Sequence, residues 1–398
     1  MREIMKNWKI MLFAFVLFEG CKKPYNPEVI SATENYLVVE GLINSGSDST
    51  IIKLNRTVKL SDAVNVNPEL NAVVTVDGDD NTTHLLNETA NGTYVSAGLN
   101  LSAAHKYRLR IKTGGTREYL SDYVPVLNAP PIDSVTYKVK SDGVDINLNT
   151  HDAVNNSRYY RWEYDETWVF VSAHQSEYKS NGDTVLRRDL INDEIYTCWA
   201  TNASSVITLG SSAKLSANVI SDAPITFISR HSEKIWHKYS ILVRQYALTK
   251  EGYDFWQNLK KNTEQLGSIF DAQPSQIKGN IHAVNNPLEP VIGYVSVGNF
   301  SVKRHFVDQR NLPAWIDPNN SGCIVGVYLY AFQDPNTGEV VNQVDQYINF
   351  NKATRGPIIP IEGIQPQGAP KLLGFKGSTP ECVDCTLRGT NKQPNFWQ

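Results

Sequence analysis

Hydrophobic and polar residues alternate along much of this chain, which is the pattern of β-strands that bury only one face. Tyr107, Leu109 and Ile111, for example, alternate with lysines and arginines. Clusters of Gly, Asn, Asp and Pro stand between such runs and mark turns. The pattern therefore predicts a mainly β protein. In the first third of the chain the expected strands are 36–43, 50–54, 72–77, 93–96, 106–112 and 117–124.

The spacing of these strands predicts an N-terminal immunoglobulin-like β-sandwich over residues 35–127. Residues 128–131 then read Asn-Ala-Pro-Pro. Because proline is excluded from central strands, we expect the boundary of this module there. Residues 132–308 are expected to form a second sandwich, similar in pattern to a fibronectin type III domain. Its expected strands are 135–139, 144–148, 158–171, 198–199, 225–229, 239–248, 277–283, 291–297 and 301–307.

One amphipathic helix interrupts the β pattern of the second sandwich. The spacing of apolar residues changes there from two to three or four, as Tyr253 and Trp256 illustrate. Thr249 is a suitable N-cap because its hydroxyl can accept a hydrogen bond from a free amide of the first turn. Gly267 is a stop signal. The sequence therefore predicts a helix over 250–266 whose aromatic stripe packs on the second sandwich.

Residues 309–398 contain many Asn and Pro residues, with one expected strand at 324–332. We expect a loop-rich C-terminal part that packs on the second sandwich. The aromatic pair Phe396-Trp397 could anchor a partner, because aromatic residues dominate interface hot spots. The favoured interpretation is that this pair docks on the protein's own body, since a chain end is ordered only when something holds it.

The first 20 residues are expected to be a signal peptide. A basic start precedes a nine-residue apolar run at 10–18, which suits an export signal and is too short to span a bilayer. Residues 18–21 read Phe-Glu-Gly-Cys and resemble a lipobox, so Cys21 is expected to carry lipid. Residues 21–34 would then form a short tether. The alternative is an ordinary signal peptide followed by an incidental cysteine.

Four further cysteines suggest two disulfides in an exported chain, with free thiols or a single bridge as the alternative. They are Cys198, Cys323, Cys382 and Cys385. The C-x-x-C pair reads better as two disulfide ends than as a redox pair or half a zinc site. No βαβ unit and no further closely spaced ligands accompany it. A bridge from one of this pair to Cys323, with Cys198 joined to the other, would fix the C-terminal part.

Composition and motifs narrow the possible functions. The net charge is −3 and there is no long basic block, which argues against nucleic acid as a partner. The hydrophobic content of 41% argues against global disorder. The sequence contains no H-E-x-x-H, no G-x-S-x-G and no phosphate loop, so we predict no catalytic residue and no cofactor site. The chain is accordingly expected to be non-enzymatic.

The acidic residues from Asp77 to Glu88 partly match the spacing of a calcium loop. Thr82 stands where such a loop needs glycine for its sharp turn. The dipeptide Asp77-Gly78 is also a strong hairpin signal. A plain turn is therefore the preferred interpretation, and we predict no metal site.

Three blocks carry a family resemblance: YSILVRQYALTKEGYDFW at 239–256, GSIFDAQPSQIKGNI at 267–281 and CVDCTLRGTNKQPNFW at 382–397. Together they resemble a family of Bacteroidota outer-membrane lipoproteins of unknown function, usually encoded beside TonB-dependent receptors. The resemblance implies a lipid-anchored protein of the outer membrane, and it leaves open whether the protein faces the cell surface. It also implies a TonB-dependent receptor as partner, contacted through residues outside the N-terminal sandwich.

Three function classes follow. The first is a non-enzymatic accessory subunit of a TonB-dependent receptor or transporter. The second is a cell-surface adhesin or glycan-binding lipoprotein, and the third is a hydrolase with a dispersed site. Members of this bacterial group also attach O-glycans at short Asp-Ser/Thr patterns. The matching hydroxyl residues are Ser49, Ser134 and Thr184.

Overall fold

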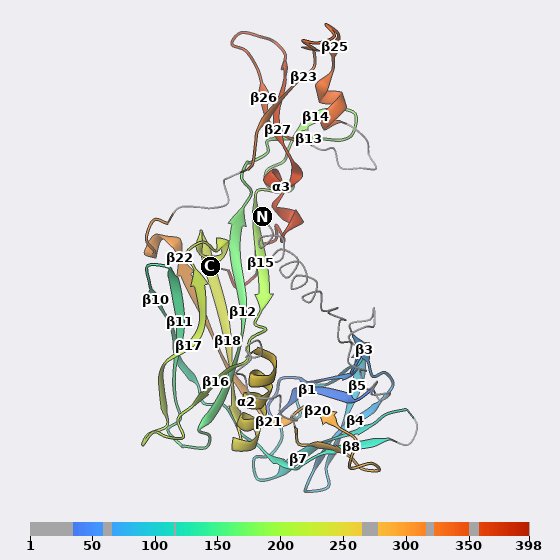
Figure 1. The fold of residues 1–398 in the computed structure, drawn as a ribbon, viewed down its shortest axis with the longest axis vertical. Coiled ribbons are helices and arrows are strands. Elements are labelled where there is room, and N and C mark those ends of the chain that lie inside the picture. The colour runs from blue at the N-terminus through green and yellow to red at the C-terminus, as the bar shows by residue number, and fades with distance from the viewer. Residues whose placement is uncertain are drawn as a thin grey trace, which may run out of the picture.

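The computed structural model describes residues 35–58, 66–114, 117–264, 278–315, 322–349 and 358–397. The signal peptide, Cys21 and the tether to residue 34 lie outside the described residues. The described chain is mainly β, as predicted, and has three parts (Figure 1). We call them the first module, the second module and the head. In the part of the chain that the structure describes, no helix is both long and apolar enough to cross a bilayer.

The first module is built from strands that enclose one core. Hydrogen bonds connect them in the order β19-β8-β7-β4-β5-β6-β2-β1-β20. Tyr94, Leu109 and Tyr119 are among the side chains that alternation turns inward and buries completely or almost completely. The strands are β1 (Leu37–Asn44), β2 (Thr50–Arg56), β3 (Asn67–Pro68), β4 (Val73–Gly78), β5 (Thr83–Ala90), β6 (Thr93–Ser96), β7 (Lys106–Lys112), β8 (Glu118–Ser121), β9 (Val124–Pro125), β19 (Ile281–Ala283), β20 (Val291–Ile292) and β21 (Ser296–Gly298).

Strands β19, β20 and β21 join the first module although they follow the second in the sequence. β19 pairs with β8, while β20 and β21 pair in parallel with β1. Ile281, Val291 and Val297 are buried in the core of the first module. Our expectation that residues 277–297 extend the second sandwich is therefore wrong. The alternation of apolar residues predicts strands there, but it carries no information about which sheet they join.

The second module consists of two packed sheets. A three-stranded sheet contains β10 (Ile132–Val139), β11 (Gly143–His151) and β17 (Val219–Ser229). A five-stranded sheet contains β12 (Tyr159–Val171), β15 (Thr197–Ala203), β16 (Thr208–Ser211), β18 (Lys238–Leu248) and β22 (Phe300–Asp308). Between them, the buried indole of Trp162 donates a hydrogen bond of 2.8 Å to Gln245 Oε1. This satisfies a polar group that would otherwise be costly to bury.

Helix α2 (Lys250–Glu264) follows β18 directly, as the sequence predicts. Thr249 is its N-cap, since its Oγ1 accepts a hydrogen bond of 3.1 Å from the amide of Gly252. The predicted end of the helix at 265–266 lies outside the described residues. Phe255 is buried, so α2 presents its aromatic side to the two modules and its polar side to solvent.

The head combines a hairpin from the second module with most of the C-terminal part. Its elements are β13 (Tyr178–Ser180), β14 (Val185–Arg187), β23 (Gly326–Leu329), β24 (Phe332–Gln333), β25 (Val340–Val341), η4 (Val344–Ile348), β26 (Ile359–Ile364) and β27 (Gly374–Ser378). Val344, Ile348 and Phe375 form its core. The head lies at the opposite end of the molecule from the first module (Figure 1). The expectation that residues 309–398 form mostly loops packed on the second module is therefore wrong, because they contribute strands to the head. The sequence does not predict most of these strands, since they are short and lack a strong alternating pattern.

Two disulfides tie the head to the second module. Cys198 in β15 is joined to Cys385, and Cys323 is joined to Cys382. Short helices α3 (Pro380–Val383) and η5 (Cys385–Leu387) carry the C-x-x-C pair. The connection that these residues form, together with residues 172–177 and 188–196, is called the neck below.

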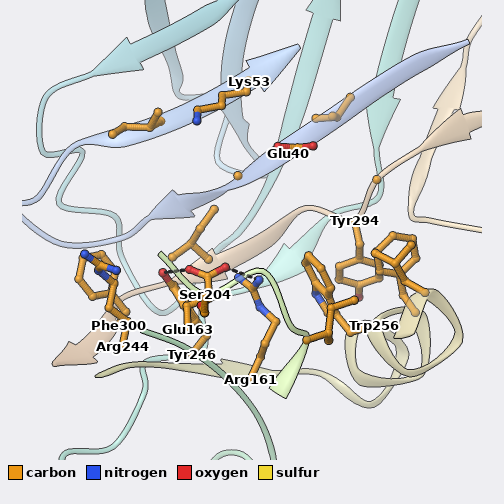
Figure 2. A pocket seen from close by; sticks show the side chains of 18 of the residues that line it. Glu40, Lys53, Arg161, Glu163, Ser204, Arg244, Tyr246, Trp256, Tyr294 and Phe300 are labelled. Carbon is orange, nitrogen blue, oxygen red and sulfur yellow. Dashed lines mark hydrogen bonds and ion pairs between the residues drawn. The ribbon is translucent and has the colours of Figure 1, made fainter. Parts of the chain in front are cut away.

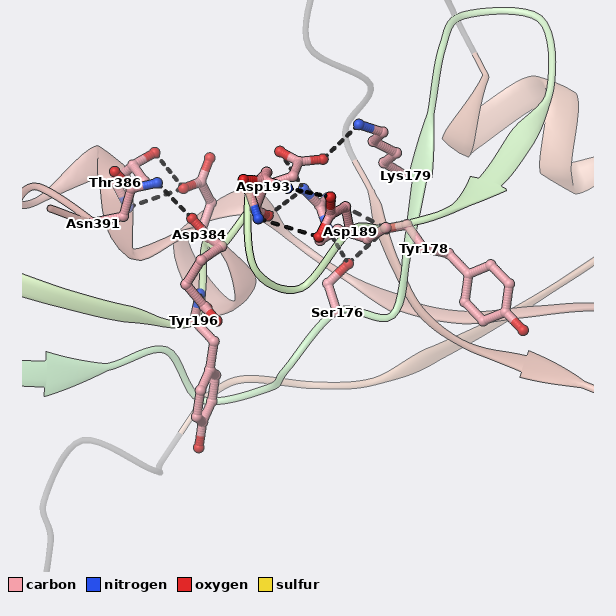
Figure 3. A network of polar contacts seen from close by, with 12 residues as sticks. Ser176, Tyr178, Lys179, Asp189, Asp193, Tyr196, Asp384, Thr386 and Asn391 are labelled. Atoms are coloured by element: carbon pink, nitrogen blue, oxygen red, sulfur yellow. Dashed lines mark hydrogen bonds and ion pairs between the residues drawn. The ribbon is translucent and has the colours of Figure 1, made fainter.

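Polar contacts reinforce the neck (Figure 3). Ser176 Oγ donates a hydrogen bond of 2.7 Å to the carbonyl of Pro360 in the head. Lys179 Nζ lies 2.6 Å from Asp193 Oδ2. The disulfides and these contacts join segments that are far apart in sequence, so together they hold the head on the second module.

The aromatic pair near the end of the chain docks on the second module. The ring of Trp397 lies 5.7 Å from that of Phe306 and 6.3 Å from that of Trp199, measured between centroids. The guanidinium of Arg304 lies 3.5 Å from the centroid of Phe396. The favoured interpretation of this pair, docking on the protein's own body, is confirmed.

Candidate ligand-binding cleft

A cavity of about 670 Å³ separates the first module from the second. Its volume lies within the range of sites that bind small ligands. The outer face of β1 and β2 forms one wall (Figure 2). The outer face of β12 and β18 and one side of α2 form the other. We refer to this space as the cleft.

A stacked arginine dominates the second-module wall. The guanidinium of Arg161 lies 4.6 Å from the ring centroid of Tyr246 and 4.1 Å from that of Trp256. Its Nη1 is 2.5 Å from Glu163 Oε1. The second oxygen of Glu163 accepts a hydrogen bond of 2.9 Å from the hydroxyl of Tyr246. Because residues two apart share a face of a strand, β12 places Arg161 and Glu163 side by side.

Burial controls the ionisation of the groups beside this stack. It raises the pKa of Tyr246, an effect to which the nearby Glu163 carboxylate adds. The phenol therefore remains a neutral hydrogen-bond donor at physiological pH. One row further along β18, Arg244 hydrogen-bonds to Asp165, and this bond is the main reason that the pKa of Arg244 is raised. The charges on this wall are thus arranged in pairs.

The first-module wall carries two charges that are not paired. Glu40 in β1 stands directly opposite Lys53 in β2. Both residues are exposed, and within the described ranges neither side chain makes a hydrogen bond or an ion pair. Ile51, of which 47% is exposed, and half-buried Leu42 surround them with apolar surface. This wall therefore offers both signs of charge to whatever enters the cleft.

Helix α2 and the loop after β15 close one end of the cleft. Lys260 Nζ donates a hydrogen bond of 2.6 Å to the carbonyl of Ile207, and Glu264 accepts one of 2.6 Å from the amide of Ile207. The hydroxyl of Tyr294 lies 2.9 Å from Thr249 Oγ1 at the start of the helix. This contact joins the start of α2 to the segment between β20 and β21, which belongs to the first module. These contacts fix the aromatic wall in place.

Comparison with known protein families identifies the family to which this chain belongs. The sequence profile of a Domain of unknown function (DUF4249) matches residues 22–304. The chain belongs to the DUF4249 family. The matched segment includes both walls of the cleft, the crossover strands β19–β21 and helix α2, and ends within β22. Strands β23–β27 of the head lie beyond it.

Other comparisons add little to the DUF4249 assignment. No curated protein matches the sequence. Among solved structures, the adhesin InvE of Yersinia pseudotuberculosis is 13% identical, with 53% of this chain and 54% of that chain covered. This chain thus spans about half the length of that adhesin. The TM-score is 0.13, which is too low to support an argument about fold or function.

The residues singled out from the sequence lie mostly outside the cleft. The four cysteines are in the neck. Asp77 and Glu88 lie at opposite ends of the β4–β5 hairpin, and Asp77 is 2.6 Å from Arg110 Nε, so this segment is the plain turn that we preferred. Within the described residues, no three His, Cys, Asp or Glu side chains lie close enough to hold a metal ion.

The sequence does not predict the cleft, although it contains a signal for part of the lining. Alternation along residues 159–171 shows that Arg161 and Glu163 share the face opposite to buried Trp162. The facing wall carries Glu40 and Lys53, more than 100 positions away. No local sequence pattern connects the two walls.

The three candidate O-glycosylation positions differ in accessibility. Ser49 borders the cleft and is exposed, and Thr184 is exposed in the turn of the β13–β14 hairpin. Ser134 is half-buried, and its Oγ accepts a hydrogen bond of 2.9 Å from Asn149. Peptide mapping of native protein should therefore find glycan at Ser49 and Thr184 in preference to Ser134. Unmodified hydroxyls at all three positions would contradict this prediction.

Proposed function

We propose that this chain is a lipid-anchored, non-enzymatic binding protein of the outer membrane and an accessory subunit of a TonB-dependent receptor. The observation that supports a binding role is the cleft between the two modules, which is lined by aromatic rings and by charges of both signs. The membrane location and the receptor rest on the resemblance of residues 239–256, 267–281 and 382–397 to Bacteroidota lipoproteins. We also propose that the first module is immunoglobulin-like and the second fibronectin type III-like.

The side chains of the cleft are arranged to hold a ligand. Both oxygens of Glu163 accept hydrogen bonds from neighbouring side chains, and Arg161 lies against two aromatic rings. Such mutual support fixes side-chain geometry and favours recognition, because less conformational entropy is lost on binding.

The length of the tether supports a position near the membrane. Only sixteen residue steps separate Cys21 from the start of β1 at Leu37. A chain of that length spans at most roughly 55 Å when fully extended. With Cys21 lipidated, the start of β1 stays within this distance of the bilayer, which keeps the first module near an outer-membrane receptor.

Co-purification from native membranes tests the proposal. A tagged chain extracted in mild detergent should recover a TonB-dependent receptor. Deleting residues 35–127 would be a poor control, because it removes the sheet that β19–β21 complete. The substitutions Gln257→Glu and Lys261→Glu at exposed positions of α2 should weaken recovery, whereas Asn91→Asp at an exposed position of the first module should not. If no such receptor is recovered, the adhesin interpretation takes first place.

Lipid attachment can be tested separately. The variant Cys21→Ser should appear in the soluble fraction, because it lacks the acyl chains that bury hydrocarbon in the bilayer. Fractionation of cells followed by intact-mass analysis checks this. A mature wild-type chain without acyl groups would disprove the anchor while leaving the cleft and its ligand unaffected.

A further inference from the structure

We propose that the cleft binds a neutral, polyhydroxylated ligand, namely a short oligosaccharide without charged groups. This inference rests on the binding role proposed for the cleft and names the class of ligand. It is carried by the charge balance of the lining, by its mixture of donors and acceptors, and by its aromatic surfaces.

The charges around the cleft cancel. Three cations line it, and three carboxylates either line it or neutralise one of those cations. The cations are Lys53, Arg161 and Arg244, and the carboxylates are Glu40, Glu163 and Asp165. A site selective for an anion or a cation needs an excess of the opposite sign, since electrostatic complementarity sets specificity. With Asp165, which pairs with Arg244 from outside the lining, these charges sum to zero, and this balance favours a ligand that is polar without net charge.

The lining also has unused hydrogen-bonding capacity of both kinds. Guanidinium and ammonium groups only donate, whereas ionised carboxylates only accept. The side chains of Glu40 and Lys53 are exposed and make no hydrogen bond within the described residues. A hydroxyl group donates one hydrogen bond and accepts others. Ligands rich in hydroxyls can therefore use neighbouring donors and acceptors together.

Aromatic side chains supply the apolar part of the site. Trp256, Tyr294 and Phe300 are half-buried and line the cleft (Figure 2). Their rings offer flat surfaces suited to the C–H faces of a pyranose ring, whose hydroxyls point outward toward polar groups. The volume of about 670 Å³ accommodates a ligand of a few sugar units.

A peptide is a weaker candidate because the cleft offers no free strand edge. Peptides often bind by adding a strand to an exposed sheet edge. In the cleft walls, β1 is paired with β2 on one side and with β20 and β21 on the other. β18 is likewise paired on both sides, with β12 and β22. A peptide would have to be recognised through its side chains and termini alone.

Binding to the purified mature chain, without any receptor, tests the inference. An array of neutral oligosaccharides selects a probe, and calorimetry then compares it with uronic-acid oligosaccharides and with short peptides. We expect a neutral oligosaccharide to bind, with at least tenfold loss of affinity in Trp256→Ala and in Glu163→Gln. Gln257→Ala, on the exposed face of the same helix, is the matched control and should bind like wild type.

Each other outcome overturns the inference. Preferential binding of acidic oligosaccharides or of peptides would assign a different ligand class, and no binding of any neutral oligosaccharide would exclude this one. Glutamine has nearly the same size as glutamate, so unchanged binding in Glu163→Gln would place the site elsewhere. Because no receptor is present, these results are independent of the co-purification experiment.

Discussion

A fragment of residues 35–131 is expected to remain unfolded in isolation, although it contains nine of the strands of the first module. It lacks β19, β20 and β21, which contribute Ile281, Val291 and Val297 to the core. Burying one such side chain contributes about 1.5–3 kcal/mol. Losing several of them removes a large part of the roughly 5–15 kcal/mol by which a domain is stable. Circular dichroism during thermal unfolding measures the effect.

A second fragment provides the control for this prediction. Joining residues 278–299 to the fragment through a flexible linker restores all three strands, and cooperative unfolding should return. If the fragment 35–131 alone unfolds as cooperatively as the extended one, the crossover strands are dispensable and the described arrangement of the first module is wrong.

Opening the bond between Cys198 and Cys385 is expected to destabilise the neck strongly. This disulfide closes a loop of 187 residues, and a cross-link over so long a loop is worth about 5 kcal/mol in the chain-entropy account. Both sulfurs are buried against Phe170, so Cys198→Ser and Cys385→Ser would also leave a polar hydroxyl in an apolar site. Chemical denaturation of the double variant measures the loss.

The second disulfide offers a comparison within the same neck. The bond between Cys323 and Cys382 spans 59 residues, and Cys323 is half-buried, so the double variant at these positions should lose less stability. The fluorescence contributed by Trp397, measured as the difference from Trp397→Phe in the same background, should report the release of the docked chain end only in the first double variant. Equal stability of the first double variant and wild type would contradict the role assigned to this bond.

The sequence predicts those parts of the fold that depend on local pattern. Alternation predicts β7 with its observed bounds, and the change of spacing with Thr249 as N-cap predicts the start of α2. The crossover strands could be predicted as strands but not assigned to the first module. Their partners in β1 and β8 lie more than 150 residues away, and local periodicity cannot specify such pairs.

The head and the cleft escape prediction for related reasons. The strands of the head are two to six residues long, so each carries too little pattern to stand out from loop sequence. The cleft depends on how two modules face each other. Its charged residues look in the sequence like ordinary solvent-exposed positions of alternating strands, and only the structure brings Arg161 and Glu40 to opposite walls of one space.

Photo-crosslinking in living cells tests most directly the proposal that this chain works as a subunit of a receptor. A photoreactive residue replaces Gln257 or Lys261 on the exposed side of α2, and Asn91 in the first module serves as the control position. We predict adducts with a TonB-dependent receptor from the two helix positions and none from the control. Abundant crosslinks from α2 that never include such a receptor, or receptor adducts from Asn91 alone, would contradict it.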